Sequence, residues 1–150
     1  MVFSRLARAF IVGAITVGAA TIAYAQQVAS EAELDDWAKQ TYKTYCTECH
    51  GLTGKGDGPY LKLLSSNVVV PDLTEIAKRN GGTFPILRVY QFIDGENRSS
   101  AHHPAIMPNW GAIYRNRSRN LNRNPNYNHQ EYVRARIAAL TQYIYRLQAK

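Results

Sequence analysis

The sequence predicts a helical fold made of a single domain. Apolar residues recur at steps of three and four in several stretches, which is the period of an amphipathic helix. Two longer helices are expected near the ends of the chain and two shorter ones between them, at about 30–46, 129–147, 72–80 and 83–95. No strand–helix–strand pattern is visible, and a chain of 150 residues can bury one sizeable core.

The first helix begins with a capping box, in which Glu33 follows Ser30 by three residues. Acidic residues lie near its start and Lys39 and Lys43 lie later, an order that suits the helix dipole. One buried stripe is expected along this helix. It is formed by Leu34, Trp37, Ala38, Thr41, Tyr42 and Tyr45.

Capping residues also mark the later helices. A capping pattern from Asp72 to Glu75 starts one helix, which the glycines at 81–82 end. Thr83, with Pro85 near the first turn, opens the next helix. That helix is expected to bury Ile86, Val89, Tyr90 and Ile93.

The last helix is capped by Asn128, with Glu131 three residues later. His129 is expected to be a solvated residue near its start. The apolar stripe of this helix is Val133, Ile137, Leu140, Ile144 and Leu147. The two terminal helices are expected to pack against each other, through Ala38 and Tyr42 on one side and Leu140 and Tyr143 on the other.

Cys46-Thr47-Glu48-Cys49-His50, at the end of the first helix, has the spacing of a covalent attachment site for a c-type haem. Two thiols three positions apart can form thioethers to the two vinyl groups of one porphyrin, and His50 then offers an imidazole to the iron. A zinc site, a redox dithiol and a disulfide are alternatives. Zinc usually needs a second paired motif, a dithiol site follows a strand, and a disulfide leaves His50 unexplained.

Four glycines among the eight residues 51–58 exclude a helix and suit a loop that wraps closely against a flat ligand. A phosphate-binding loop is disfavoured, because no strand precedes the stretch and the Gly-Lys-Ser/Thr ending is missing. A carbonyl in the stretch up to Pro59 could accept the Nδ1 proton of His50 and fix its ring.

Met107 is the only methionine besides Met1. It lies in a loop expected from Ala101 to Ala112. Because a thioether is a soft ligand that raises the reduction potential of haem iron, Met107 is predicted to be the second axial ligand, with core filling as the alternative. His102 and His103 compete for the same coordination position.

Residues 1–25 have the layout of a secretory signal peptide: Arg5 and Arg8 come first, then an apolar run, then small residues at the cleavage site. Cleavage after Ala25 would leave one domain of residues 26–150 and place it in the periplasm. An uncleaved membrane anchor is the alternative, because the apolar run approaches the shortest length that spans a bilayer, about 17 residues.

The expected mature chain is basic. Without Arg5 and Arg8, 16 of the 18 basic residues remain against 11 acidic ones, a net charge of +5. Such a balance suits nucleic acid, an anionic membrane or an acidic protein, and export argues against nucleic acid. An Arg- and Asn-rich stretch from Tyr114 to Asn128 is expected to be a long surface loop, either a landing patch for an acidic partner or a solvated connector.

In order along the chain, five segments are similar to those of class I c-type cytochromes, the small monohaem cytochromes of the bacterial periplasm. They are Cys46-x-x-Cys49-His50, the loop at 54–59, Pro71 to Thr74, Asn80 to Pro85, and Met107-Pro108-x-Trp110-Gly111. The resemblance implies an all-α, cytochrome c-like fold, with orthogonally packed N- and C-terminal helices around one covalently bound haem. It also implies His50 and Met107 as axial ligands of the iron. The stretch at 114–128 departs from the family by its length.

The function expected is one-electron transfer between a donor and an acceptor protein, without enzymatic chemistry, because two protein ligands leave the iron no open position. One alternative is a dedicated cytochrome subunit of a periplasmic dehydrogenase or oxidase complex. Another is a gas-binding or peroxidatic haem protein, which needs an open sixth position. No nucleophile elbow of a hydrolase is present.

Overall fold

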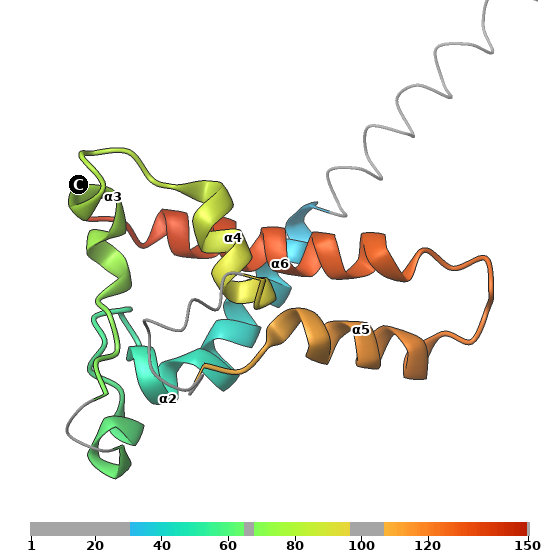
Figure 1. Ribbon diagram of the computed structural model, residues 1–150, viewed down its shortest axis with the longest axis horizontal. Coiled ribbons are helices and arrows are strands. Elements are labelled where there is room, and N and C mark those ends of the chain that lie inside the picture. Colours follow the sequence, from blue (N-terminus) through green and yellow to red (C-terminus); the bar gives the residue numbers. More distant parts are fainter. Residues whose placement is uncertain (1–30, 65–67, 97–106, 150) are drawn as a thin grey trace, which may run out of the picture. The chain divides into compact units, whose positions relative to one another are not determined.

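The computed structural model describes residues 31–64, 68–96 and 107–149, and these contain helices and no strand (Figure 1). The all-α class predicted from the sequence is therefore confirmed. Residues 34–150 form one compact unit, and residues 1–33 form another, of which only 31–33 are described. The expected signal peptide at 1–25 lies outside the described residues. Within the described residues, no helix is both long and apolar enough to cross a membrane.

The N-terminal helical stretch runs from residue 31 to residue 50, four residues beyond the expected end at Cys46. It is α-helical over 31–41, widens into a π-turn η1 (Tyr42–Cys46), and continues as α2 (Thr47–His50). Two hydroxyl groups donate to the carbonyls four residues earlier, Thr44 to Gln40 at 2.9 Å and Thr47 to Lys43 at 2.8 Å. The predicted haem-binding motif, residues 46–50, therefore lies within helical structure.

The π-turn explains the one error in the predicted stripe of this helix. Ala38, Thr41 and Tyr42 are buried as expected, but Tyr45 is 56 % exposed. A π-turn bonds each residue to the fifth one along and so holds more residues per turn than an α-helix. The period that buries Tyr42 therefore no longer applies one turn later, and Tyr45 points outward.

The terminal helices meet in the core, as the sequence predicts. The last helix is α6 (His129–Arg146), and its inward stripe of Val133, Ile137, Leu140 and Ile144 is buried. The rings of Tyr42 and Tyr143 lie 4.9 Å apart between their centroids. Arg136 lies over the ring of Trp37 at 4.3 Å, and Arg146 pairs with Asp35. These contacts join the two ends of the domain.

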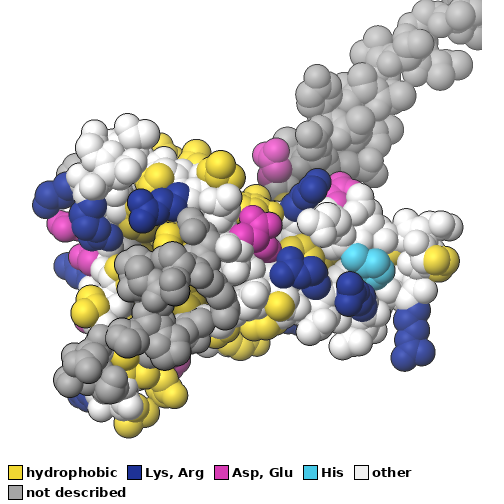
Figure 2. All heavy atoms as spheres, viewed as in Figure 1, with side chains coloured by type: hydrophobic (Ala, Val, Ile, Leu, Met, Phe, Trp, Pro, Cys, Tyr) yellow, Lys and Arg dark blue, Asp and Glu magenta, His cyan; other side chains and the backbone are white. Residues whose placement is uncertain are grey.

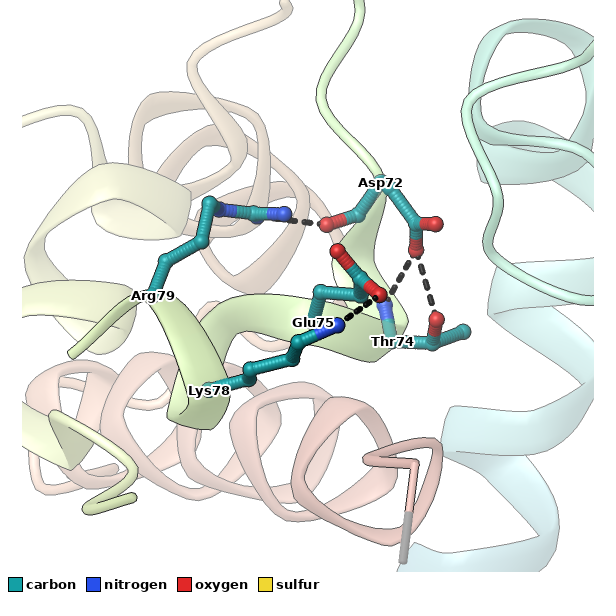
Figure 3. Close-up of polar contacts among 5 residues, drawn as sticks. All are labelled: Asp72, Thr74, Glu75, Lys78 and Arg79. Carbon is teal, nitrogen blue, oxygen red and sulfur yellow. Dashed lines mark hydrogen bonds and ion pairs between the residues drawn. The ribbon is translucent and has the colours of Figure 1, made fainter. Parts of the chain in front are cut away.

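The helical turn predicted after Asp72 begins at its cap, whereas the next helix begins at Ile86, after Pro85, and not at Thr83. Asp72 caps the 3₁₀-turn η3 (Leu73–Glu75) by accepting hydrogen bonds from the backbone and the hydroxyl of Thr74, at 2.8 and 2.7 Å (Figure 3). Helix α3 (Ile76–Arg79) follows, and Arg79 donates to the Asp72 carbonyl at 2.6 Å. A further 3₁₀-turn, η2 (Pro59–Leu63), lies in the loop before them.

Helix α4 (Ile86–Asp94) ends at Gly95, which adopts a left-handed φ of 86°. Val89 and Ile93 are buried as expected and Tyr90 is half-buried, but Ile86 is exposed. Ile86 lies in the first turn of the helix, where fewer neighbours surround the side chains. The predicted buried set of α4 is therefore wrong at this one position.

The largest difference from the sequence analysis is α5 (Trp110–Leu121), which takes up the end of the loop expected at 101–112 and the first half of the surface loop expected at 114–128. Asn109 caps it by accepting from the amide of Ala112 at 2.8 Å. Its buried residues are Trp110, Gly111, Tyr114 and Ser118. This inward face is so narrow that arginines and asparagines fill five of the eight other positions of the helix, which conceals the helical period.

Helices α5 and α6 pack side by side and run in opposite directions (Figure 1). The hydroxyl of Ser118 and Nδ1 of His129 lie 2.7 Å apart and link the two helices. His129 therefore lies at the start of α6 as predicted, but it is half-buried and bonded rather than solvated. Only residues 122–128 remain as a connector between the two helices.

Candidate haem-binding site

Cys46, Cys49 and His50 lie at positions i, i+3 and i+4 of the N-terminal helical stretch, so they share one face of it. Both thiols are free, and both are partly buried. Burial, and next the charge of Cys49, raise the pKa of the Cys46 thiol to about 12. Burial and Glu48 raise the pKa of the Cys49 thiol. The site therefore disfavours thiolates and suits uncharged sulfur, which is the state of sulfur in a thioether.

Its buried surroundings favour the neutral form of the His50 imidazole. Burial lowers its pKa, and the backbone carbonyl of Pro71 opposes this effect in part. Nδ1 of the ring is buried and forms no hydrogen bond of normal geometry with any described residue. A ring that turns Nδ1 toward the protein presents Nε2 on its other side, and a neutral imidazole nitrogen is the form that binds a metal.

The carbonyl that faces His50 belongs to Pro71, and not to the stretch up to Pro59 as the sequence suggested. Pro71 lies directly before the Asp72 cap of η3, so the turn shown in Figure 3 fixes its position. In the sequence, Pro71 stands out only as the start of one of the five segments similar to class I c-type cytochromes. Nothing local in the sequence relates it to a histidine more than twenty residues away.

The glycine-rich loop closes on the end of α2. The amide of Gly56 donates to the carbonyl of His50 at 2.8 Å, and the amide of Gly58 donates to that of Cys49 at 3.1 Å. Tyr42 adds a buried hydrogen bond from its hydroxyl to the Gly51 carbonyl at 3.0 Å. At Gly58 the two backbones are so close that a Cβ would lie 2.5 Å from the carbonyl carbon of Glu48. This loop therefore fixes the haem-binding motif from its C-terminal side.

Met107 lies three residues before α5 and is 38 % exposed. Ring contacts of Trp110 hold the first turn of α5 against the rest of the fold. Trp110 stacks on Tyr114 at 5.8 Å between ring centroids and lies 5.6 Å from the ring of Tyr45. The competitors His102 and His103 lie outside the described residues.

A partly buried ion pair holds the junction of α4 and α5. Asp94 is 4 % exposed, and its carboxylate lies 3.5 Å from the guanidinium of Arg115. Gly111 lies so close to it that an added Cβ would be 2.7 Å from Cγ of Asp94. The carboxylate of Asp94 lies at the C-terminal end of α4, where the helix dipole disfavours a negative charge. The positive end of the α5 dipole and the guanidinium of Arg115 together offset this cost. The sequence analysis missed this pair, because its residues are 21 positions apart.

The described residues fit a covalently attached haem. Two partly buried thiols and an imidazole with a buried Nδ1 share one helical face, and the loop behind them is closed by main-chain hydrogen bonds. No group of three or more His, Cys, Asp or Glu residues in the described part of the chain could hold a metal ion. The zinc alternative therefore has no set of ligands among these residues.

The chain matches the family model for cytochrome c over residues 37–148. Because this match covers most of the chain, the protein belongs to the cytochrome c family. Among curated proteins and solved structures, no significant match is found. Membership in this family makes the protein a haem-based electron-transfer protein with covalently bound haem c, iron and redox partners.

Proposed function

We propose that this protein is a one-electron carrier of the periplasm, with a single haem held by thioethers from Cys46 and Cys49 and with His50 and Met107 as axial ligands of the iron. The observation that carries the proposal is the common helical face of Cys46, Cys49 and His50, with His50 neutral and its Nδ1 turned inward. The haem, when bound, supplies an iron that takes up and releases one electron.

The residues of the chain contribute binding and orientation. The backbone carbonyl of Pro71 raises the pKa of His50 against the effect of burial, and so favours a more basic ligand. The glycine-rich loop holds the carbonyls of Cys49 and His50 in place through main-chain hydrogen bonds from Gly58 and Gly56. The anchored first turn of α5 restricts the position of Met107, three residues before it.

Covalent attachment is tested by producing the full chain together with a bacterial c-type haem maturation system. We expect the denatured protein to keep the added mass of one haem and to be recovered from the periplasmic fraction with its N-terminus at Gln26. A double substitution, Cys46→Ser with Cys49→Ser, removes the added mass, whereas substitution of an exposed residue such as Thr44→Ser leaves it. A denatured wild type without added mass, or with the mass of two haems, would refute the proposal.

A further inference from the structure

A cleft of about 250 Å³ opens between the N-terminal helical stretch and α5. We call it the aromatic cleft, because four aromatic rings make up most of its wall. Its lining residues are Trp37, Thr41, Tyr45, Trp110, Ile113, Tyr114 and Arg117. The rings of Trp37 and Tyr114 meet edge to face at 5.5 Å between centroids.

We propose that an acidic electron-transfer protein docks on the aromatic cleft, where Arg117 pairs with one of its carboxylates and the rings receive one of its apolar side chains. The inference rests on the proposed function, since it assumes electron exchange with another protein. It adds the surface at which that exchange takes place and the chemistry of the partner.

The size and the wall of the cleft favour a protein side chain as the occupant. Pockets for cofactors and drug-sized ligands start at about 300 Å³, which is more than this cleft holds. Tyr45 and Ile113 expose apolar surface at its wall. Tyrosine, tryptophan and arginine are also the residue types that dominate the binding energy of protein interfaces.

The charge around the cleft indicates an acidic partner. The sequence contains no Asp or Glu between Glu96 and Glu131, although several arginines lie there. Arg115 is paired with Asp94, but the exposed Arg117 and Arg119 form no ion pair with a described residue. Several basic side chains lie on the visible face formed by α5 and α6 (Figure 2). Complementary charge speeds encounter and selects against wrong partners.

The aromatic cleft also lies beside the residues proposed to hold the haem. Tyr45 directly precedes Cys46, and Trp110 follows Met107 by three positions. A partner on this cleft therefore comes close to the haem-binding motif, which matters because electron transfer slows steeply with distance. An anionic membrane is the rival occupant, but a flat layer of headgroups cannot fill a concave cleft with aromatic walls.

The chain offers a direct reporter, because its only two tryptophans, Trp37 and Trp110, both line the cleft. The haem-loaded protein, labelled with ¹⁵N in the indole rings, is titrated with a short peptide of glutamates around one central leucine. Control probes are the same peptide with serine at its centre, a lysine-rich peptide of equal length, and vesicles of phosphatidylcholine with phosphatidylglycerol. Arg117→Glu is compared with Arg123→Glu, an equal change of charge outside the cleft.

We expect the acidic leucine peptide to shift both indole signals, the serine peptide to bind more weakly, and the lysine peptide to cause no shift. Arg117→Glu weakens binding about fivefold, whereas Arg123→Glu weakens it less than twofold. If Arg117→Glu does not fold, Arg117→Gln replaces it. Equal effects at both positions, or indole shifts with the vesicles and none with the acidic peptide, would overturn the inference. A normal haem spectrum in the same samples separates such a failure from a failure of the proposed function.

Discussion

Replacing Gly58 with alanine tests how closely the glycine-rich loop packs on the haem-binding motif. Gly58 has a φ of −66°, which alanine adopts without strain. If the site were open, Gly58→Ala would stabilise the fold by about 0.4–1 kcal/mol, because it restricts the unfolded chain. The added Cβ would instead lie 2.5 Å from the carbonyl carbon of Glu48 and 2.6 Å from that of Cys49, both main-chain atoms.

The expected cost of Gly58→Ala follows from these contacts. Overpacking against rigid atoms costs about 1–3 kcal/mol, and loss of the 3.1 Å hydrogen bond to Cys49 adds about 1 kcal/mol. The free energy of unfolding should therefore fall by about 2–4 kcal/mol, and the melting temperature by roughly 10 °C. Urea unfolding of the haem-loaded protein measures the free energy of unfolding, and thermal unfolding measures the melting temperature.

A matched control separates crowding from backbone conformation. Gly81 has a positive φ of 65° and no atom within 4 Å of the position of an added Cβ. Gly81→Ala should therefore cost only the conformational penalty of about 1–2 kcal/mol. A Gly58→Ala variant as stable as the wild type, or more stable, would show that the loop does not close on α2 in the described way.

Three further predictions concern the core and its caps. Tyr114→Phe removes a buried hydroxyl that has no described partner, so the free energy of unfolding should stay unchanged or rise by up to about 1 kcal/mol. Tyr42→Phe removes the hydrogen bond to the Gly51 carbonyl, so the free energy of unfolding should fall by about 1 kcal/mol in urea unfolding. A larger loss in Tyr114→Phe than in Tyr42→Phe would contradict this. Asp94→Asn removes the charge that pairs with Arg115 and should lower the free energy of unfolding by about 1–3 kcal/mol. Glu75→Gln, at the exposed pair with Lys78, should change it by less than about 1 kcal/mol. Equal changes would show that burial of Asp94 does not strengthen its pair with Arg115. Hydrogen bonds from the hydroxyl and amide of Thr74 lower the pKa of Asp72, so this contribution is present above pH 3.8 and disappears as the pH falls through the lowered value. The stability deficit of Thr74→Ala at pH 7 should accordingly shrink in strong acid, and a deficit that is constant with pH would exclude the coupling.

The features that depend on neighbouring residues were predictable from the sequence. Asn128 accepts from the amide of Glu131 and Asp72 accepts from that of Thr74, as their capping patterns indicate. The pairing of Tyr42 with Tyr143 was predictable because Tyr42 lies on the apolar stripe of one terminal helix and Tyr143 lies beside the stripe of the other. Local hydrogen bonding and a regular period carry this information directly.

Other features leave no clear pattern in the sequence and were not predictable. Helix α5 was taken for a loop because its buried face needs only Trp110, Gly111, Tyr114 and Ser118, and the apolar content of the stretch is low. The widely spaced Trp110, Tyr114 and Ser118, each four residues apart, were the available signal. Tyr45 was misplaced because no sequence rule marks a π-turn. The carbonyl facing His50 comes from Pro71, which only the folded chain brings near it.

The central claim of the account is that His50 and Met107 together hold the iron. The optical spectrum of the haem-loaded ferric protein tests it most directly, compared between wild type, Met107→Ala, and a control with His102→Ala and His103→Ala. A weak long-wavelength band, typical of a thioether ligand, should be present in the wild type and the control and absent from Met107→Ala. A wild type without this band, or a band that survives in Met107→Ala, would contradict the claim.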